Sequence, residues 1–534
     1  MRRSEISFRR SGLPWLVAGV IAFVTVACSA AAPADGRRDA ALDTLLRMRV
    51  IGRADAWRER AVKGNSCPGA EVATLLLGIA GTFEPVVTLD DALVVLAREK
   101  IVWNDYWRAH AVTGGQCDGE YVANLLRAAA EPLADRALVL EHGPPAGLLP
   151  AAEPTAFAAV PTASGLGAPN TVIGTQTIGG RYRFTSEPLL VETAEAIRAM
   201  GSDTIKFHLW PGYGGAQGNV EEPRPGIQSL VELARDEPAH RRVLDMPFSR
   251  ILLWAHTFHK QGSPDMWRKG LSDAAAEAER HEIYDLACHL LRTYSGSGKT
   301  FYIGHWEGDG WLRGTVDAAN DARVDEVACQ GMADWLTVRQ RAVDDAKRDT
   351  PHEGVALWHY TEVNHVKLAM QGRPALVNRV LPRVPVDLVS YSCYDTQQDP
   401  ALLKAALSFI ETQLPPKPGI AGRRVFIGEY GFPADRFPPP EQDRLSRQVI
   451  KAGLEWGAPL ILYWELYNNE LTADGRQRGF WMIDDKGQKQ PIYRTHEAFY
   501  ARARNAVAES ERRHDRPQSA MEFRAAALEF LARP

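Results

Sequence analysis

The chain has 534 residues, of which 45% are hydrophobic and 24% are charged, and this is the composition of an ordinary globular protein. Its length accommodates one large domain and a smaller one. The formal net charge of −4 lacks the basic excess typical of nucleic-acid-binding proteins, so no nucleic-acid partner is expected.

Residues 1–30 have the pattern of a secretory signal peptide. Arginines precede the apolar run LPWLVAGVIAFVTVA, and small residues follow it in CSAAAPADG. The apolar run is short for a stable membrane span. The sequence TVAC resembles a bacterial lipoprotein signal with Cys28 as the lipidated residue, and simple cleavage near Ala30–Ala32 is the open alternative. We expect an exported protein, periplasmic or at the cell surface, with membrane anchoring if Cys28 is lipidated.

Residues 38–135 contain two stretches that match at a shift of fifty residues. VIGRADAWRERAVKGNSCPGAEVATLLLGIA (50–80) aligns without a gap to KIVWNDYWRAHAVTGGQCDGEYVANLLRAAA (100–130). Each copy predicts a helix, a glycine-containing loop and a second helix, so a small all-α tandem-repeat module is expected. Its role is open between a spacer or assembly module and attachment to cell wall or polysaccharide. Cys67 and Cys117 are equivalent in the two copies and could form a bridge, whose distance the sequence does not give.

A (β/α)8 TIM barrel, an α/β fold, is predicted for residues 170–505. Residues 136–169, rich in Pro, Ala and Gly, predict the linker before it. Eight apolar strand candidates alternate with helix patterns, which favours a closed barrel over an open doubly wound sheet. Residues 506–534 predict a charged tail with a short helix and no assigned function. The predicted strands are residues 171–177, 204–210, 250–256, 300–306, 355–361, 386–392, 424–430 and 459–465.

Polar and aromatic residues gather at the ends of these strands. In a barrel of this type the working residues lie at the C-terminal ends of the strands. Acids, aromatic rings and hydrogen-bond donors together suit a sugar-sized site and a carbohydrate substrate. The candidate residues are His208, His256, Trp306, Glu307, Glu362, Asn364, Tyr391, Tyr394, Glu429 and Trp464.

Three of these strand ends resemble those of clan A glycoside hydrolases, the retaining (β/α)8 enzymes that include mannanases and cellulases. They are GHWEGDGW after the fourth strand, FIGEYGFP at the seventh and LILYWELYNN at the eighth. The resemblance covers about residues 170–505 and does not fix a family. It implies that Glu307 is the general acid/base, that Glu429 is the nucleophile and that Trp464 forms the floor of the sugar site.

One position departs from the pattern of the clan. Most members have Asn directly before the acid/base, where it binds the substrate 2-hydroxyl, and this chain has Trp306 there. Asn364, after the fifth strand, is a candidate substitute. The departure supports a competing class, a non-catalytic carbohydrate-binding or cell-surface protein on the same barrel.

The chemistry of glycoside cleavage explains why two carboxyl groups are wanted. A retaining enzyme places them about 5–5.5 Å apart and needs separated pKa values. Trp306 and Trp311 would supply an apolar wall near Glu307, and Tyr391 or Tyr394 would donate a hydrogen bond that keeps Glu429 ionised. Glu362 is a rival proton donor, although a role as a substrate or supporting ligand is favoured.

No metal or cofactor is expected. In HYTEVNH, His359, Glu362 and His365 are three apart, so on a strand they face opposite sides and do not suit a shared metal ion. SGSGKT (295–300) precedes a strand rather than a helix and has Thr293 where a phosphate-binding loop has its first glycine.

Overall fold

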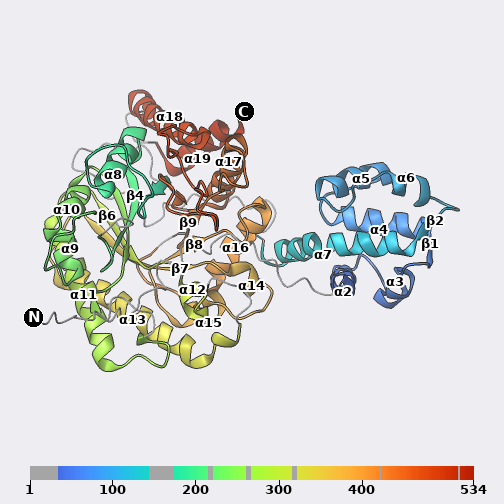
Figure 1. The fold of residues 1–534 in the computed structure, drawn as a ribbon, viewed down its shortest axis with the longest axis horizontal. Coiled ribbons are helices and arrows are strands. Elements are labelled where there is room, and N and C mark those ends of the chain that lie inside the picture. The colour runs from blue at the N-terminus through green and yellow to red at the C-terminus, as the bar shows by residue number, and fades with distance from the viewer. Residues whose placement is uncertain are drawn as a thin grey trace, which may run out of the picture. The chain divides into compact units, whose positions relative to one another are not determined.

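The computed structural model describes residues 34–143, 172–214, 220–259, 266–315, 321–420, 422–514 and 518–533. The predicted signal peptide, Cys28 included, and residues 144–169 of the predicted linker lie outside them. The chain forms two compact units, an N-terminal module and a barrel (Figure 1). Within the described ranges, no helix has both the length and the apolar character to cross a membrane.

The N-terminal module consists of helices and one small two-stranded ladder. Its elements are α2 (Ala34–Arg47), α3 (Ala54–Arg60), β1 (Ser66–Pro68), α4 (Gly69–Gly81), α5 (Leu89–Arg98), α6 (Tyr106–His110), β2 (Gln116–Asp118) and α7 (Gly119–His142). Leu76 and Leu126, equivalent in the two repeats, are buried in one common core. α7 continues into the segment predicted as linker because the buried Leu138 extends its apolar face.

The loops of the two matching stretches meet in this ladder, which was not among the predicted elements. β1 and β2 pair antiparallel. A glycine follows each strand: a Cβ on Gly69 would lie 2.3 Å from the carbonyl oxygen of His110, and one on Gly119 would lie 2.3 Å from that of Arg60. Because only glycine permits such an approach, the loop of each repeat is held against the helix start of the other.

The second unit is a closed barrel of eight parallel strands, which confirms the predicted fold class. The order around the barrel follows the chain, and β10 pairs with β3 through Ile461 and Ile173 to close it. The strands are β3 (Ile173–Gln176), β4 (Thr204–Leu209), β5 (Arg250–Ala255), β6 (Thr300–Gly304), β7 (Ala356–Val363), β8 (Leu388–Ser392), β9 (Val425–Tyr430) and β10 (Ile461–Tyr463).

Large side chains fill the interior of the barrel. Tyr302, Tyr360, Phe426 and Leu462 belong to one buried cluster contributed by different strands. The ring of Tyr360 packs directly against Gly304. A Cβ at this position would lie 2.3 Å from the ring, so only glycine leaves room for it. The interior is therefore packed, and chemistry is left to the C-terminal strand ends.

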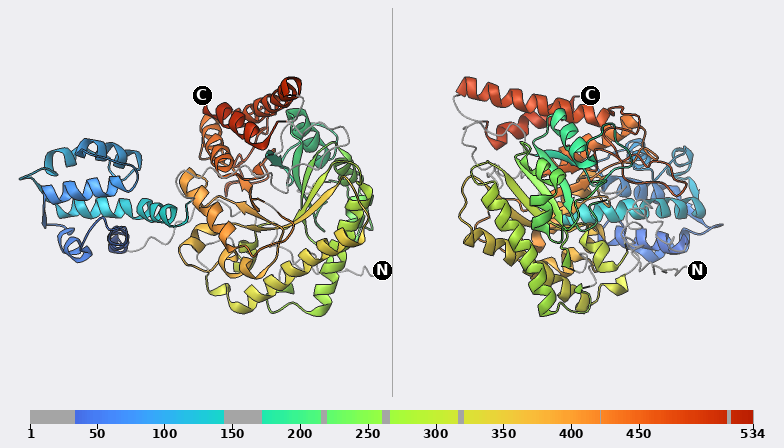
Figure 2. Two further views of the ribbon diagram at one scale, coloured as in Figure 1. Left: turned by 180° about the vertical axis from the view of Figure 1, so that it is seen from behind. Right: turned by 60° about the vertical axis from the view of Figure 1, so that its left-hand side comes forward.

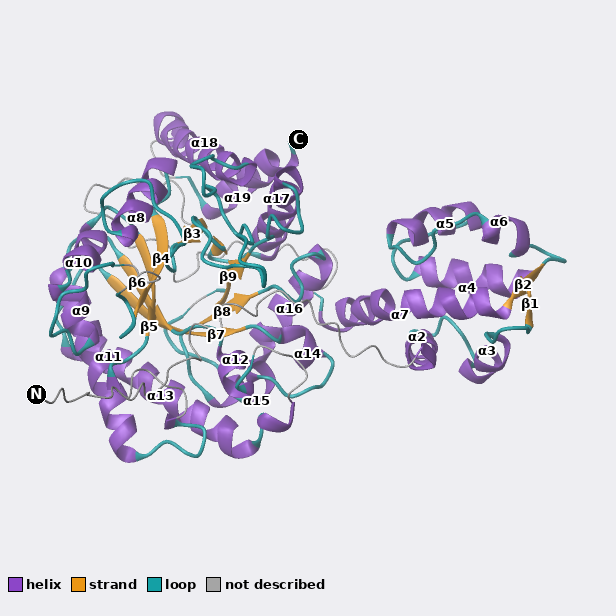
Figure 3. Cartoon of the chain, viewed as in Figure 1, coloured by secondary structure: helices purple, strands orange, loops and turns teal. Residues whose placement is uncertain are grey.

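Helices cover the outside of this barrel, and Figure 3 shows the strands enclosed by them. Short helices and turns occupy the loops after β6 and β7. The helices are α8 (Leu189–Met200), α9 (Leu230–Asp236), α10 (Pro238–Asp245), α11 (Asp273–Thr293), α12 (Gly308–Arg313), α13 (Glu326–Asp349), α14 (Val366–Met370), α15 (Leu376–Arg379), α16 (Pro400–Gln413), α17 (Pro439–Trp456), α18 (Pro491–His514) and α19 (Ala520–Ala532), with 3-10 turns at Asp321–Arg323 and Leu381–Arg383.

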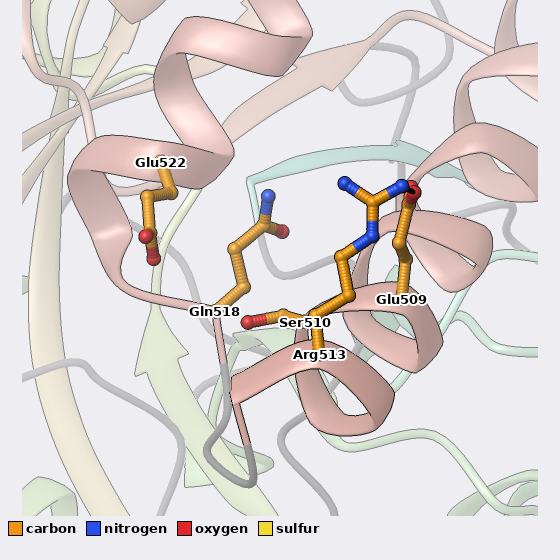
Figure 4. A pocket seen from close by; sticks show the side chains of 5 residues that line it. All are labelled: Glu509, Ser510, Arg513, Gln518 and Glu522. Atoms are coloured by element: carbon orange, nitrogen blue, oxygen red, sulfur yellow. Dashed lines mark ion pairs between the residues drawn. The ribbon is translucent and has the colours of Figure 1, made fainter.

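The C-terminal segment packs on the barrel unit rather than extending from it. The ring of Phe499 on α18 contacts those of Phe523 and Phe530 on α19, with centroids 6.1 and 5.8 Å apart. Both views in Figure 2 show α17, α18 and α19 together. A small hollow between α18 and α19 has only polar side chains around it (Figure 4). They are Glu509, Ser510, Arg513, Gln518 and Glu522.

Candidate active site

Glu307 lies just beyond the end of β6, where the loop passes into α12. Its side chain is only 1% exposed. Asn364, the first residue after β7, donates from Nδ2 to Glu307 Oε2 at 3.1 Å. The backbone N–H of Glu307 donates to Glu362 Oε1 at 3.0 Å. The end of β7 therefore holds both the backbone and the carboxyl group of Glu307.

Glu429 points into the barrel because β9 carries a bulge. Strict alternation from the inward-facing Phe426 would turn Glu429 outward. The pairing between β8 and β9 shifts register between Tyr391/Ile427 and Ser392/Glu429. Such bulges re-aim side chains and are frequent beside active sites. Gly428 sits at the bulge, where a Cβ would overlap Ser390 Oγ at 1.7 Å.

Lys206, in the middle of β4, links the two sides of this site. Its Nζ donates to Glu429 Oε1 at 3.2 Å and to Glu362 Oε2 at 3.0 Å. It also lies 4.1 Å from the ring centroid of Trp254. Lys206 was not among the residues predicted from the sequence, where its signal is a charged residue inside the otherwise apolar strand TIKFHLW.

The remaining contacts of the carboxyl groups complete the site. Tyr394 OH donates to Glu429 Oε2 at 3.3 Å. Ser390 Oγ donates to Glu362 Oε2 at 2.7 Å. With Lys206 and the N–H of Glu307, Glu362 thus accepts three hydrogen bonds, which hold its carboxyl group in place.

The surroundings of Glu307 and Glu429 affect the pKa values of the two carboxyl groups differently. Burial, with the charges of Glu429 and Glu362 adding to it, raises the pKa of Glu307 well above its usual range. Burial also raises the pKa of Glu429, to about 8, but Lys206 and Tyr394 oppose this rise. Lys206 is a cation beside Glu429, whereas the side chain that donates to the Glu307 carboxyl is the neutral amide of Asn364. A proton is therefore held more readily by Glu307 than by Glu429.

An aromatic cluster lies beside these carboxyl groups. Trp254 packs against Trp306 and Trp464, with ring centroids 6.3 and 5.9 Å apart. Tyr394 and Phe480 belong to the same cluster. The cluster joins the ends of different strands and supplies apolar ring faces of the kind that sugars stack on.

Glu470 is a further acid of this region that the sequence analysis did not identify. Trp464 Nε1 donates to Glu470 Oε1 at 3.2 Å. Burial raises the pKa of Glu470 to about 7, and the nearby Arg478 opposes the rise. Its charge acts on Glu307, so it belongs to the same site. The only sequence signal was its place in the loop that follows the last strand.

Tyr391 was predicted as a site residue, but its side chain points away from the site. Its side chain is fully buried, and its OH donates to Asp395 Oδ1 at 2.5 Å. Ser390 and Ser392 flank it on the inward face of β8, so alternation turns Tyr391 toward the surrounding helices. The hydrogen bond to Glu429, predicted for either tyrosine, comes from Tyr394.

The two predicted histidines are buried against tryptophan rings. His256 stacks on Trp311, with ring centroids 5.0 Å apart. His208 contacts Trp210 edge-on at 5.3 Å. Burial lowers the pKa of His208 to about 3 and that of His256 well below its usual value, so both rings are neutral near pH 7. Within the described residues, neither histidine ring is hydrogen-bonded to Glu307 or Glu429.

The described residues contain no group of three His, Cys, Asp or Glu side chains arranged to hold a metal ion. Within HYTEVNH the ring of His359 contacts Gln340 of α13, whereas Glu362 faces Lys206 inside the barrel. The two side chains thus lie on opposite faces of β7, as their spacing predicts.

Among known proteins, similarity to this chain is found in solved structures. No family model matches the chain, and no curated protein matches it. A family 39 glycoside hydrolase from the gut symbiont Bacteroides cellulosilyticus WH2 aligns over 61% of this chain and 62% of its own, with 14% identity and a TM-score of 0.38. ZgEngAGH5_4 aligns over 62% of this chain and 96% of its own, with 12% identity and a TM-score of 0.36.

A calcium-binding mutant of Bacteroides uniformis β-glucuronidase 2 aligns over 62% of this chain and 34% of its own, with 9% identity and a TM-score of 0.37. This chain therefore spans less than two thirds of the family 39 enzyme and about a third of the glucuronidase. At these identities and TM-scores, the fold assignment rests on the strand order of the barrel.

Proposed function

We propose that this chain is an exported glycoside hydrolase that cleaves a poly- or oligosaccharide by a retaining double displacement. The observation that carries the proposal is the meeting of Glu307 and Glu429 at one end of the barrel. Glu362 connects them, because it accepts from the backbone N–H of Glu307 and from Lys206, which also donates to Glu429. The charge of Glu429 also acts on the carboxyl of Glu307. Two carboxyl groups with different environments are what this mechanism requires.

Glu307 is the proposed general acid/base. Its raised pKa keeps the carboxyl protonated until a leaving oxygen needs the proton. Asn364 holds the group in place through Oε2. After the leaving group departs, the same carboxylate takes a proton from the water that attacks the intermediate.

Glu429 is the proposed nucleophile. Lys206 and Tyr394 each donate to its carboxylate and favour the charged form that attacks the anomeric carbon. Their contacts also fix the direction in which the oxygens point. When the ester to the sugar later breaks, the same two donors stabilise the carboxylate that is released.

The sugar would be bound by the groups around the pair. Trp306 and Trp464 offer ring faces, and Glu470 and Asn364 offer polar atoms that can bond to hydroxyl groups. Glu362 acts as a positioning residue because its oxygens are occupied by Lys206, Ser390 and the backbone of Glu307.

The test begins with the full-length chain and a panel of aryl glycosides and polysaccharides. On the best aryl substrate, Glu429→Ala should lose activity on all leaving groups alike. Glu307→Ala should retain the first step with a good leaving group and accumulate the glycosyl-enzyme. Added azide should rescue Glu307→Ala with retained anomeric configuration and Glu429→Ala with inverted configuration, as read by NMR of the products.

Glu411→Gln is the matched control, because Glu411 is a carboxyl held by the backbone of Arg424 at the N-terminal end of β9. It should leave turnover near the wild-type value. An acid/base phenotype in Glu362→Ala, with Glu307→Ala fully active, would move the role to Glu362. Full activity in both Glu307→Ala and Glu429→Ala would end the assignment.

The second candidate is a carbohydrate-binding protein without catalysis. Trp306 favours this second candidate, because this tryptophan stands where most clan A enzymes have the asparagine that binds the 2-hydroxyl. This candidate predicts saturable binding to a member of the panel with no product from it, in the wild type and in both glutamate variants.

A further inference from the structure

The two buried cysteines of the N-terminal module face each other across the β1–β2 ladder. The register pairs Cys67 with Cys117 directly. Both side chains are almost fully buried, at 0% and 1% exposure. Residues directly opposite each other in an antiparallel pair project to the same side of the ladder, so the two thiols share one enclosed space.

The spacing of the two backbones suits a covalent bridge. Opposed residues of an antiparallel pair have Cα atoms about 4.5–5.5 Å apart. Disulfides in proteins span Cα separations of about 4.4–6.8 Å. With both thiols free, Cys67 Sγ lies 3.5 Å from the carbonyl oxygen of Arg60.

The register that brings the cysteines together is held on both sides. Gly69 N–H donates to the carbonyl oxygen of Gly115, and Gly119 N–H donates to that of Asn65, each at 2.8 Å. Ser66 Oγ donates to Gln116 Oε1 at 2.7 Å beside the pair. The pairing therefore cannot slip without breaking these bonds.

We propose that Cys67 and Cys117 form a disulfide that joins the two repeats when the protein folds in an oxidising environment. Two thiols give up two protons and two electrons, and a low-molecular-weight disulfide such as oxidised glutathione accepts them. One cysteine thiolate attacks that disulfide and releases one glutathione thiolate. The second cysteine thiolate then attacks the protein-bound sulfur and releases the other.

The burial of the thiols determines the stage of folding at which the disulfide can form. Burial raises the pKa of Cys117 to about 11 and also raises that of Cys67, so little thiolate exists in the folded, reduced module. Oxidation is therefore expected during folding, while the ladder is still accessible. Once formed, the bridge is shielded from reductants by the same core.

The experiment compares the full-length protein refolded in oxidised and in reduced glutathione. After denaturation, alkylation of free thiols and trypsin digestion without reductant, we expect one linked species of peptides 64–98 and 109–127 in the oxidised sample. The linked species should persist in the matched control Cys288→Ser, which removes a buried cysteine of α11 instead. In Cys117→Ser, the linked species should be absent, and Cys67 should be alkylated or carry glutathione.

Thermal unfolding provides a second readout that needs no variant. The midpoint of the module should be several degrees higher after oxidative refolding than in the presence of reductant. The proposal is overturned if both cysteines are alkylated, or carry glutathione separately, in oxidatively refolded protein of native helix content. The result is independent of any glycosidase activity, since the barrel carboxyls take no part in it.

Discussion

Replacing Lys206 with methionine removes a positive charge that contacts both Glu429 and Glu362 while keeping a side chain of similar length. The Nζ atom lies 3.2 Å from Glu429 Oε1, and both side chains are almost excluded from solvent. An opposite charge at such a distance lowers a carboxyl pKa by about 1–3 units. The pKa of Glu429 is about 8 with burial raising it and Lys206 opposing that rise, so loss of Lys206 should raise it further.

The sign of the effect follows from the role of Glu429 as the ionised nucleophile. The rising limb of kcat/KM against pH reports ionisation of the nucleophile in the free enzyme. That limb should move to higher pH by about 1–3 units, so activity at a fixed pH below the limb should fall about 10–1000-fold. Raising the pH should recover part of the loss, which would not happen if the site had simply collapsed.

Two variants control for this reading. Lys206→Arg keeps the charge, so its rising limb should stay near that of the wild type even if turnover falls through altered geometry. Lys299→Met removes a buried lysine that donates to the carbonyl oxygen of Phe248 at the opposite end of the barrel. It should lower stability without moving the limb. An unmoved limb in a folded Lys206→Met would refute the role given to Lys206.

Arg339→Met should lower the free energy of unfolding by about 3–5 kcal/mol in chemical denaturation, because it leaves the buried carboxylate of Glu279 without its partner; a change below about 1 kcal/mol would contradict this. Glu470→Gln should raise KM more than it lowers kcat, and an unchanged KM would remove Glu470 from the sugar site. Cys28→Ser should release the protein from the membrane fraction or block its maturation; a wild type found wholly in the soluble periplasmic fraction would exclude lipidation. A chain that begins at Gly165 should fold and keep the activity of the full-length protein, and its loss would show that the repeats complete the barrel unit.

Much of the fold could be predicted because its signals are local. Each barrel strand is an apolar run of a few residues between turn signals. Seven of the eight predicted runs contain an observed strand, and β7 extends two residues beyond the remaining one. The ladder between β1 and β2 escaped prediction because each strand has three residues and pairs across about fifty positions. The end of α7 also escaped prediction. The last turns of this helix are stabilised by the burial of Leu138, which cannot be seen in the sequence.

The sequence by itself determined which carboxyl groups stand at strand ends, because the position of Glu307 and Glu429 after apolar runs is a property of neighbouring residues. Only the tertiary structure decided what surrounds them. Lys206 meets Glu362 and Glu429 across 156 and 223 positions, which closure of the barrel alone brings about. The bulge at β9 depends on the register with β8, and it turns Glu429 inward. Tyr394, rather than Tyr391, serves Glu429 because the alternation of β8 faces Tyr391 outward.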